Sequence, residues 1–293
     1  MLLQLVVYGI TMGSTFALVA MGWSLVFGVL ELINFAHGAF VLAGAYLSIL
    51  FIFRLGLPFA VGVLLAMTIC GLCGYLMERS ALRQIRKRGQ SPIAALICTV
   101  GFAMVIDNLL IVVFGSEPQS FPDALNLGTF RILDDVIVPW LSVIIMCVTL
   151  AMMVILMLII YKTEFGAAMR ATSQNRRAAS LMGINVNSII GTTFFLGTFC
   201  AALAGALVGM SYTSVDTGMS FQLGIKTFAA AVLGGIGNLP AAIFGGLVIG
   251  IIESLVVGYI GASYRDVVAF AVLVLVLFIK PTGLFGKEAL KKV

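Results

Sequence analysis

Long apolar blocks of about 20 residues recur along this chain, and no other feature limits its fold as strongly. A helix needs roughly 20 apolar residues to cross a hydrocarbon layer about 30 Å thick. Crossings are expected near Leu3–Val29, Ile33–Phe53, Leu57–Met77, Ile93–Phe114, Val136–Ile160, Ser188–Met210 and Val267–Ile279. The stretch Leu223–Tyr259 is apolar, glycine-rich and long enough for two short crossings.

Composition agrees with a chain that lies mostly in lipid. Of its residues, 61% are hydrophobic and only 10% are charged, whereas a soluble domain carries roughly 25% charged residues. Membrane β-barrel strands alternate in polarity over about 10 residues, and these blocks are continuously apolar. The sequence therefore predicts an all-α, polytopic transmembrane bundle in a single domain over residues 1–293, with about eight or nine membrane segments, some broken or re-entrant.

Basic residues gather in a few loops, which predicts the orientation of the chain. The Arg79–Arg88 loop, the segment 162–187 and the tail from Lys280 to Lys292 are rich in Lys and Arg, so these parts and the C-terminus are expected in the cytoplasm. The acidic Gly115–Asp135 loop, with Glu117, Asp123, Asp134 and Asp135, is expected outside. The side of the N-terminus stays open: nine crossings place it outside, and eight place it inside.

The sequence offers no catalytic constellation. It lacks the G-x-x-x-x-G-K-[ST] string of a nucleotide-binding P-loop, and His37 is its only histidine. We therefore expect no enzyme activity, no metal and no cofactor in this chain. The charge bias of the loops accounts for the pI near 9.0, so nucleic acid is not an expected partner. A glycine-rich bundle with few buried charges suits a pathway for a small solute.

The segment 162–187 is polar and able to form helix between two apolar blocks. Ala167–Ala171 and Arg176–Met182 favour helix, the polar run Thr172–Asn175 separates them, and Gly183 is a natural helix stop. Two short helical pieces are expected on one face of the membrane. A solvated basic loop is the simpler alternative for such a segment.

Part of this segment resembles the coupling segment of ABC importer permeases, whose signature is E-A-A-x-x-x-G. Ala178, Ala179 and Gly183 keep that spacing, with Arg177 in place of the usual Glu. The wider string resembles the branched-chain amino acid permease branch, of the LivH type. The positions that match this branch are Thr163, Gly166, Arg170, Ala171, Ala178, Ala179, Gly183, Ile184 and Asn185.

Other strings agree with this branch in the expected order. Residues 28–38 contain I-N-F-A-H-G, residues 44–46 read G-A-Y, and residues 231–237 read A-V-L-G-G-I-G. The resemblance implies a permease in the bacterial cytoplasmic (inner) membrane that works with a second, LivM-type permease, two cytoplasmic ATPases and an external binding protein. ATP and Mg²⁺ would bind in the ATPases. Coupling to them would involve Gly166, Arg170, Ala171, Arg177, Ala178, Ala179 and Gly183.

Polar residues inside the apolar blocks are candidates for the translocation path. Asn34 and His37 are spaced to share a helix face if that piece is helical. Asp107 and Glu253 lie well inside apolar blocks, where a carboxylate usually faces a cavity or a partner. Such a carboxylate could pair with the α-ammonium group of a zwitterion. Hydrogen bonds between helices are the alternative role for all four residues.

Glycines predict close helix contacts and one break. Gly9/Gly13, Gly205/Gly209 and Gly246/Gly250 form G-x-x-x-G pairs, which let helix backbones approach closely. The string with Gly234, Gly235, Gly237 and Pro240 must break a helix. It is either a tight turn between two spans or a hinge near the substrate path.

Two other functions stay open from the sequence. A permease of the same branch could serve urea, amides or other amino acids, because selectivity depends partly on the binding protein. A secondary transporter or channel would need no ATPase, and its uptake would be independent of ATP.

Overall fold

Helices account for most of the described chain, as the apolar blocks predicted. The computed structural model describes residues 1–89, 91–121, 128–133, 136–280 and 282–285. The long helices are α1 (Leu2–Leu30), α2 (Ala36–Ile49), α3 (Phe59–Met77), α5 (Pro92–Phe114), α6 (Trp140–Lys162), α9 (Val186–Tyr212), α10 (Met219–Gly234), α11 (Leu239–Tyr259) and α12 (Arg265–Ile279). Within the described ranges, eight helical segments are long and apolar enough to cross a membrane, and α10 is shorter. The polytopic helical fold is confirmed.

Short elements lie between these helices. They are the π-helical turns η1 (Leu50–Arg54) and η2 (Glu78–Leu82), the helices α4 (Arg83–Lys87), α7 (Glu164–Gln174) and α8 (Arg176–Leu181), and the 3-10 turn η3 (Ala262–Tyr264). The strands are β1 (Gln119–Ser120), β2 (Thr129–Leu133), β3 (Val136–Pro139) and β4 (Ser214–Val215). Strands β1 and β4 pair, as do β2 and β3, and both pairs are antiparallel.

One crossing starts later than the sequence predicted. Residues 136–139 form strand β3 rather than the first turn of a helix, and α6 begins at Trp140. The β-branched side chains of Val136, Ile137 and Val138 favour a strand. Pro139 then fixes an extended backbone at the N-cap of α6.

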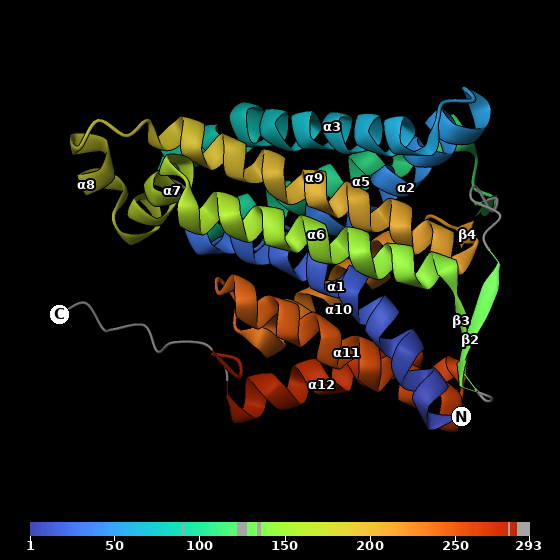
Figure 1. The fold of residues 1–293 in the computed structure, drawn as a ribbon. Helices are drawn as coiled ribbons and strands as arrows, with labels where there is room; N and C mark the ends of the chain where they lie inside the picture. The colour runs from blue at the N-terminus through green and yellow to red at the C-terminus, as the bar shows by residue number, and fades with distance from the viewer. Residues whose placement is uncertain (90, 122–127, 134–135, 281, 286–293) are drawn as a thin grey trace.

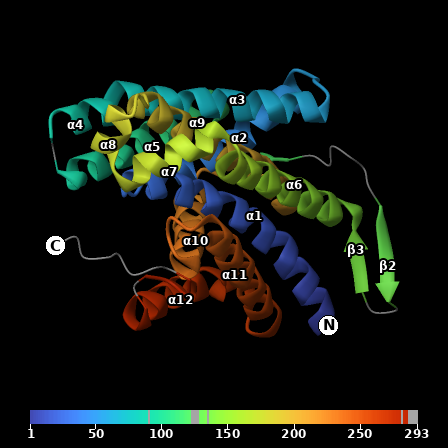
Figure 2. The same ribbon diagram turned by 60° about the vertical axis from the view of Figure 1, so that its left-hand side comes forward.

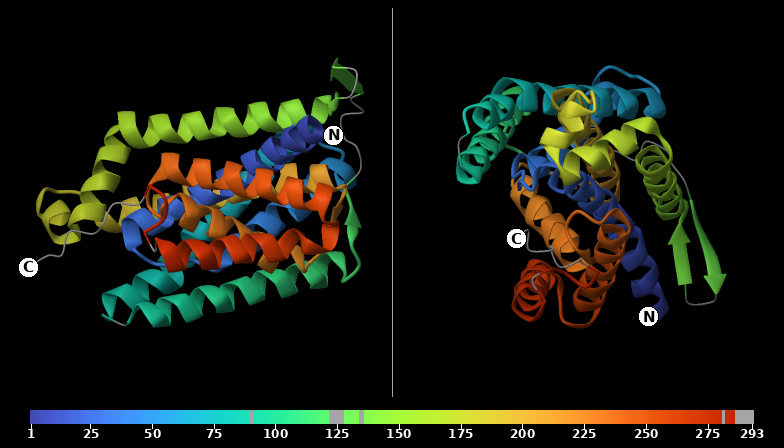
Figure 3. Two further views of the ribbon diagram at one scale, coloured as in Figure 1. Left: turned by 90° about the horizontal axis from the view of Figure 1, so that it is seen from below. Right: turned by 90° about the vertical axis from the view of Figure 1, so that its left-hand side faces the viewer.

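The bundle has two distinct ends (Figures 1 and 3). Helices α7 and α8 project at one end, while the N-terminus and the β2–β3 hairpin lie at the other. Figure 2 shows α3 on one flank and α12 on the opposite flank. Several charges that entered the orientation prediction lie outside the described residues: Asp123, Asp134, Asp135, Lys287, Lys291 and Lys292.

Helix α1 packs closely along α11 through two glycine pairs. A Cβ atom on Gly9 would lie 2.7 Å from the Cα of Ile251, and one on Gly13 would lie 2.9 Å from the Cα of Leu247. Gly246 and Gly250 meet α1 from the other side at Ala17 and Gly13. The predicted close approach at these glycines is therefore confirmed, and α1 and α11 form the most extensive helix–helix contact among the described residues.

Two of the helices begin inside the bundle. Helix α2 follows a non-helical stretch, residues 31–35, and has 14 residues before it continues into η1. Helix α10 has 16 residues, which span about 24 Å and fall short of the ~30 Å hydrocarbon layer. Non-helical backbone at membrane depth must be covered by protein or line a cavity. The expected broken segments are thus present at both places.

Candidate functional site

The segment between α6 and α9 folds into two short helices because its polar residues cap them. The Thr163 hydroxyl accepts a hydrogen bond from the Gly166 backbone N–H at the start of α7. The Asn175 side chain accepts from the backbone N–H groups of Arg177 and Ala178, both at 3.0 Å, at the start of α8. Gly183 follows α8 with a φ of 83°, a left-handed conformation that glycine adopts without strain.

Two helical pieces were predicted here and are found, although their boundary differs. The run Thr172–Gln174, expected as a linker, forms the last turn of α7, and Asn175 alone separates the helices. The hydroxyl groups of Thr172 and Ser173 donate to carbonyls of the preceding turn. These bonds satisfy polar side chains within the helix, so the run continues α7.

Helix α7 is held tightly against the end of α6. The Arg170 guanidinium donates to the Ile160 carbonyl, and Gly166 approaches the same carbonyl so closely that no side chain would fit there. Ala171 is half-buried beside this contact. Gly166 and Arg170, two of the predicted coupling residues, thus fix the position of the segment on the bundle rather than offer a free surface.

Helix α8 presents the free surface of the segment. Arg177 and Ala178 are exposed, whereas Ala179 is buried and packs inward. Leu181 and Met182 are 86% and 82% exposed, which is unusual for large apolar side chains at a polar end of a bundle. Sequence reasoning treated these two only as helix formers. The available signal for their exposure was their position in the sequence, among the three variable residues between Ala179 and Gly183 of the coupling signature.

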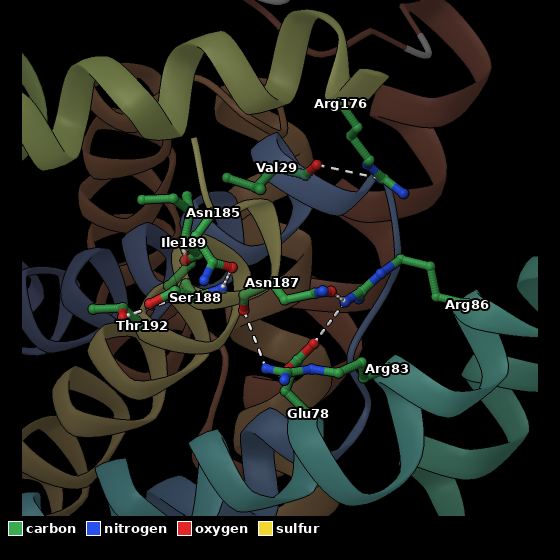
Figure 4. A network of polar contacts seen from close by, with 11 residues as sticks. Val29, Glu78, Arg83, Arg86, Arg176, Asn185, Asn187, Ser188, Ile189 and Thr192 are labelled. Atoms are coloured by element: carbon green, nitrogen blue, oxygen red, sulfur yellow. Dashed lines mark hydrogen bonds and ion pairs between the residues drawn. The ribbon is translucent and has the colours of Figure 1, made fainter. Parts of the chain in front are cut away.

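A buried acidic residue connects the neighbouring helices at the same end (Figure 4). The Glu78 side chain is fully buried, and its two oxygens accept from Arg83 at 2.9 Å and Arg86 at 2.8 Å. Both arginines also donate to Asn187 near the start of α9, at its carbonyl and its side-chain oxygen. The cluster joins η2 and α4 to α9. The sequence suggested only a positive-inside loop here.

Arg176, the first residue of α8, reaches the last turn of α1 (Figure 4). Its guanidinium donates to the carbonyls of Val29 at 3.3 Å and Leu30 at 2.9 Å. Cations are favourable at a helix C-terminus, where the carbonyls lack helical partners. Burial and the charge of nearby Arg86 lower the pKa of Arg176, and Glu31 partly offsets this. Arg176 therefore links α8 directly to the core helix α1.

An Arg176→Gln variant is expected to loosen the segment without unfolding the bundle. Hydrogen bonds from a charged donor contribute about 1.5–3 kcal/mol, and this donor is partly exposed, so we expect the lower end of that range. Hydrogen exchange in residues 164–183 should become roughly tenfold faster. Arg177→Gln is the matched control, because Arg177 is the next residue in the helix and is exposed. Equal exchange rates in the two variants would contradict the role assigned to Arg176.

Asn34 and His37 lie at the start of α2 but do not share a helix face. Asn34 precedes the helix, and its side-chain oxygen accepts from the Ala36 backbone N–H at 3.2 Å. His37 is fully buried, with its Nε2 3.3 Å from the Val19 carbonyl and its ring 5.3 Å from the Trp23 ring. The condition that this piece is helical fails because residues 31–35 are not helical and α2 begins only at Ala36.

Asp107 and Glu253 occupy different surroundings. Asp107 accepts a hydrogen bond from the Ser220 hydroxyl at 3.2 Å and lines a cavity of about 310 Å³ together with Trp23 and Phe35. Glu253 lines another cavity, of about 260 Å³. Its Oε1 lies 3.3 Å from the Lys226 ammonium and 3.0 Å from the Arg265 Nε. The four predicted path residues therefore do not form a single cluster.

The glycine string forms a turn between α10 and α11. Gly234 ends α10, Gly235 and Gly237 have positive φ angles, and Pro240 lies in the first turn of α11. Gly237 packs against Gly28 near the end of α1, where a Cβ on Gly28 would lie 3.5 Å away. The predicted helix break is confirmed, and the turn lies at the same end as α7 and α8 (Figure 3).

Comparison with known proteins gives consistent matches over nearly the whole chain. The family model described as the branched-chain amino acid transport system permease component matches residues 5–277. The chain is 37% identical to the high-affinity branched-chain amino acid transport system permease protein BraD of Pseudomonas aeruginosa, over 99% of this chain and 98% of that protein. The chain is also 37% identical to the high-affinity branched-chain amino acid transport system permease protein LivH of Escherichia coli, over 99% of this chain and 97% of that protein.

One solved structure is similar in outline. PsaBC from Streptococcus pneumoniae, solved in complex with Fab, is 21% identical with a TM-score of 0.47. The match covers 97% of this chain and 92% of that one.

Proposed function

The chain belongs to the branched-chain amino acid permease family, and we propose that it is the membrane-spanning permease subunit of an ATP-driven importer for branched-chain amino acids. It would lie in the bacterial cytoplasmic membrane. Its partners would be a second, LivM-type permease, two cytoplasmic ATPases that bind ATP and Mg²⁺, and an external binding protein. The relatives named above support both the membrane role and the substrate class.

The exposed face of α8 is the observation that carries the coupling role. Leu181 and Met182 are almost fully exposed beside Arg177, while Arg170 and Arg176 fix the segment to α6 and α1. An ATPase that binds this face would therefore move the ends of α6 and α1, to which the segment is fixed, and not a loose loop. Exposed apolar side chains next to a cation suit a protein groove with an acidic rim.

The charge distribution supports a cytoplasmic location for this end of the bundle. The arginines of η2 and α4 lie at the same end as α7 and α8, and Lys and Arg favour cytoplasmic loops. The C-terminal end of α12 reaches this end as well (Figure 3). The N-terminus then faces outside, with the β2–β3 hairpin. In this orientation α7 and α8 are within reach of a cytoplasmic ATPase.

We expect Leu181→Asp and Met182→Asp to abolish ATPase binding while the permease still folds. Loss of an apolar anchor at an interface costs about 2 kcal/mol or more, roughly 30-fold in affinity. The measurement is co-purification of the ATPases, together with ATP-dependent uptake of leucine, isoleucine and valine into proteoliposomes that contain all subunits. Gln84→Asp, exposed on α4 at the same end, is the control and should leave both unchanged.

Three outcomes would contradict the proposed function. Uptake by this chain without ATPases or ATP would indicate a secondary transporter or channel. ATP-dependent uptake of urea or amides in place of leucine would assign another substrate to the same branch. Normal ATPase binding by both aspartate variants would remove α8 from the interface.

A further inference from the structure

The two helices that begin inside the bundle meet at their first turns. A Cβ atom on Gly38, in the first turn of α2, would lie 2.8 Å from the Cα of Gly224 in α10. The two helix starts can approach this closely because both contact residues, Gly38 and Gly224, lack a side chain. In membrane transporters, the starts of such broken helices often contact the substrate. This meeting point is therefore a natural place to look for a binding site.

A cavity of about 310 Å³ lies at this meeting point, between α1, α5 and α10. Its volume is at the lower end of the range for small-molecule sites, about 300–1,000 Å³. Most of its walls are apolar: Phe35, Val100, Ala103, Met104 and Ile225. Such walls suit a branched aliphatic side chain.

Polar groups in the cavity wall are left without partners. Asp107 uses one carboxylate oxygen for the Ser220 hydroxyl, and its Oδ1 is buried with no partner among the described residues. Trp23 is 3% exposed, and its indole Nε1 also lacks a partner in the described chain. Buried polar groups in proteins nearly always have partners. Two residues that line this cavity thus each carry an unpartnered polar atom, which favours a polar ligand beside them.

The start of α10 adds further donors on the same wall. Ser220 and Phe221 belong to its first turn, and no side chain caps this helix. The first N–H groups of a helix have no helical partners, and the helix dipole favours negative charge there. The cavity thus combines one acidic group, uncapped N–H donors and apolar walls.

We propose that this cavity binds the amino acid during transport, an inference that rests on the proposed function. The Asp107 carboxylate would pair with the α-ammonium group. The Trp23 indole N–H and the first turn of α10 would donate to the α-carboxylate. Phe35, Val100, Ala103 and Met104 would surround the side chain. Wall size and the absence of other charges would then favour valine, leucine and isoleucine over polar amino acids.

The cavity beside Glu253 does not match a zwitterion in this way. The Glu253 carboxylate already lies next to two cations, Lys226 and Arg265, and Lys226 also pairs with Asp266 at 2.6 Å. These four charges sum to zero, so the group has no free charge for an ammonium ion. Asp107 has no cation within salt-bridge distance among the described residues.

The test is binding of tritiated leucine to the purified complete transporter in nanodiscs, without the binding protein. Asp107→Asn keeps the shape of the side chain and removes its charge, and Ala103→Leu fills the cavity without touching a polar group. Both should weaken leucine binding about tenfold to a hundredfold. Asn108→Ala is the matched control, one residue further along α5 and exposed. It should bind like the wild type.

Two analogues identify the role of each polar group. Leucinamide keeps the ammonium group, and 4-methylpentanoate keeps only the carboxylate. The wild type should prefer leucinamide, and Asp107→Asn should lose that preference. Wild-type leucine affinity in both Asp107→Asn and Ala103→Leu would overturn the proposed cavity, even if ATP-driven leucine uptake by the wild type still supports the importer. Absence of that uptake in the wild-type complex would instead reject the proposed function.

Discussion

A Gly250→Leu variant should fail to accumulate as a folded permease, because α1 and α11 could no longer pack. Any side chain on Gly250 would meet the backbone of Gly13. Backbone atoms cannot rotate away as a flexible side chain can. Overpacking costs about 1–3 kcal/mol and occasionally more, and we expect at least the upper end here. In lipid, close helix packing is a main source of association between helices.

The measurement is the monodisperse fraction on gel filtration and the melting temperature of the detergent-solubilised protein. Gly101→Leu is a matched control, because Gly101 lies within helix α5 and a Cβ there would have no atom within 4 Å. It should fold like the wild type. If both leucine variants give the same yield and melting temperature, the α1–α11 contact does not hold the bundle together.

A Lys226→Met variant should also destabilise the permease strongly, through the carboxylates that it leaves behind. Lys226 is 4% exposed and lies between Glu253 at 3.3 Å and Asp266 at 2.6 Å. It joins α10 to α11 and α12. Removal of one partner from a buried ion pair costs about 3–5 kcal/mol, because an uncompensated charge remains. We expect a lower melting temperature and a smaller folded fraction.

A second substitution tests that explanation. Lys226→Met with Asp266→Asn restores neutrality and leaves the Arg265–Glu253 pair, at 3.0 Å, in place. The double variant should be more stable than Lys226→Met alone, a non-additive result expected for coupled charges. A double variant as unstable as the sum of the two single changes would mean that packing of the lysine stem, and not charge balance, holds these helices.

The helices were predictable because lipid offers the backbone no hydrogen bonds. Continuous apolar blocks therefore had to form helices, and the G-x-x-x-G pairs had to mark close approach. The sequence could not show that Gly9 and Gly13 meet Gly246 and Gly250, since pairing between distant segments depends on the whole bundle. The helix-forming residues of 167–171 and 176–182, with Gly183 as a stop, allowed the two helices of the segment 162–187 to be anticipated from local chemistry alone. Their boundary was missed because the caps at Thr163 and Asn175 were not recognised.

The candidate site was less predictable, because it depends on contacts across the bundle. Glu78, directly before the basic Arg79–Arg88 loop, drew no prediction, yet it is the buried centre of a cluster that involves Asn187, more than 100 residues away in sequence. Asn34 and His37 have helical spacing, but Asn34 lies before the first turn of α2. Trp23 carried no signal, since an aromatic residue in an apolar block usually packs against neighbouring helices.

The contact between Arg176 and the end of α1 would let α8 and the proposed cavity influence each other in both directions. Arg176 donates to the Leu30 carbonyl, and the connection between α1 and α2 reaches the cavity wall at Phe35 only five residues later. A shift of α8 therefore reaches the proposed cavity along a short covalent path. Thermodynamic linkage then requires the reverse effect: an amino acid that favours one position of Phe35 must also change the affinity of α8 for its motor. The importer would register its cargo before it hydrolyses ATP.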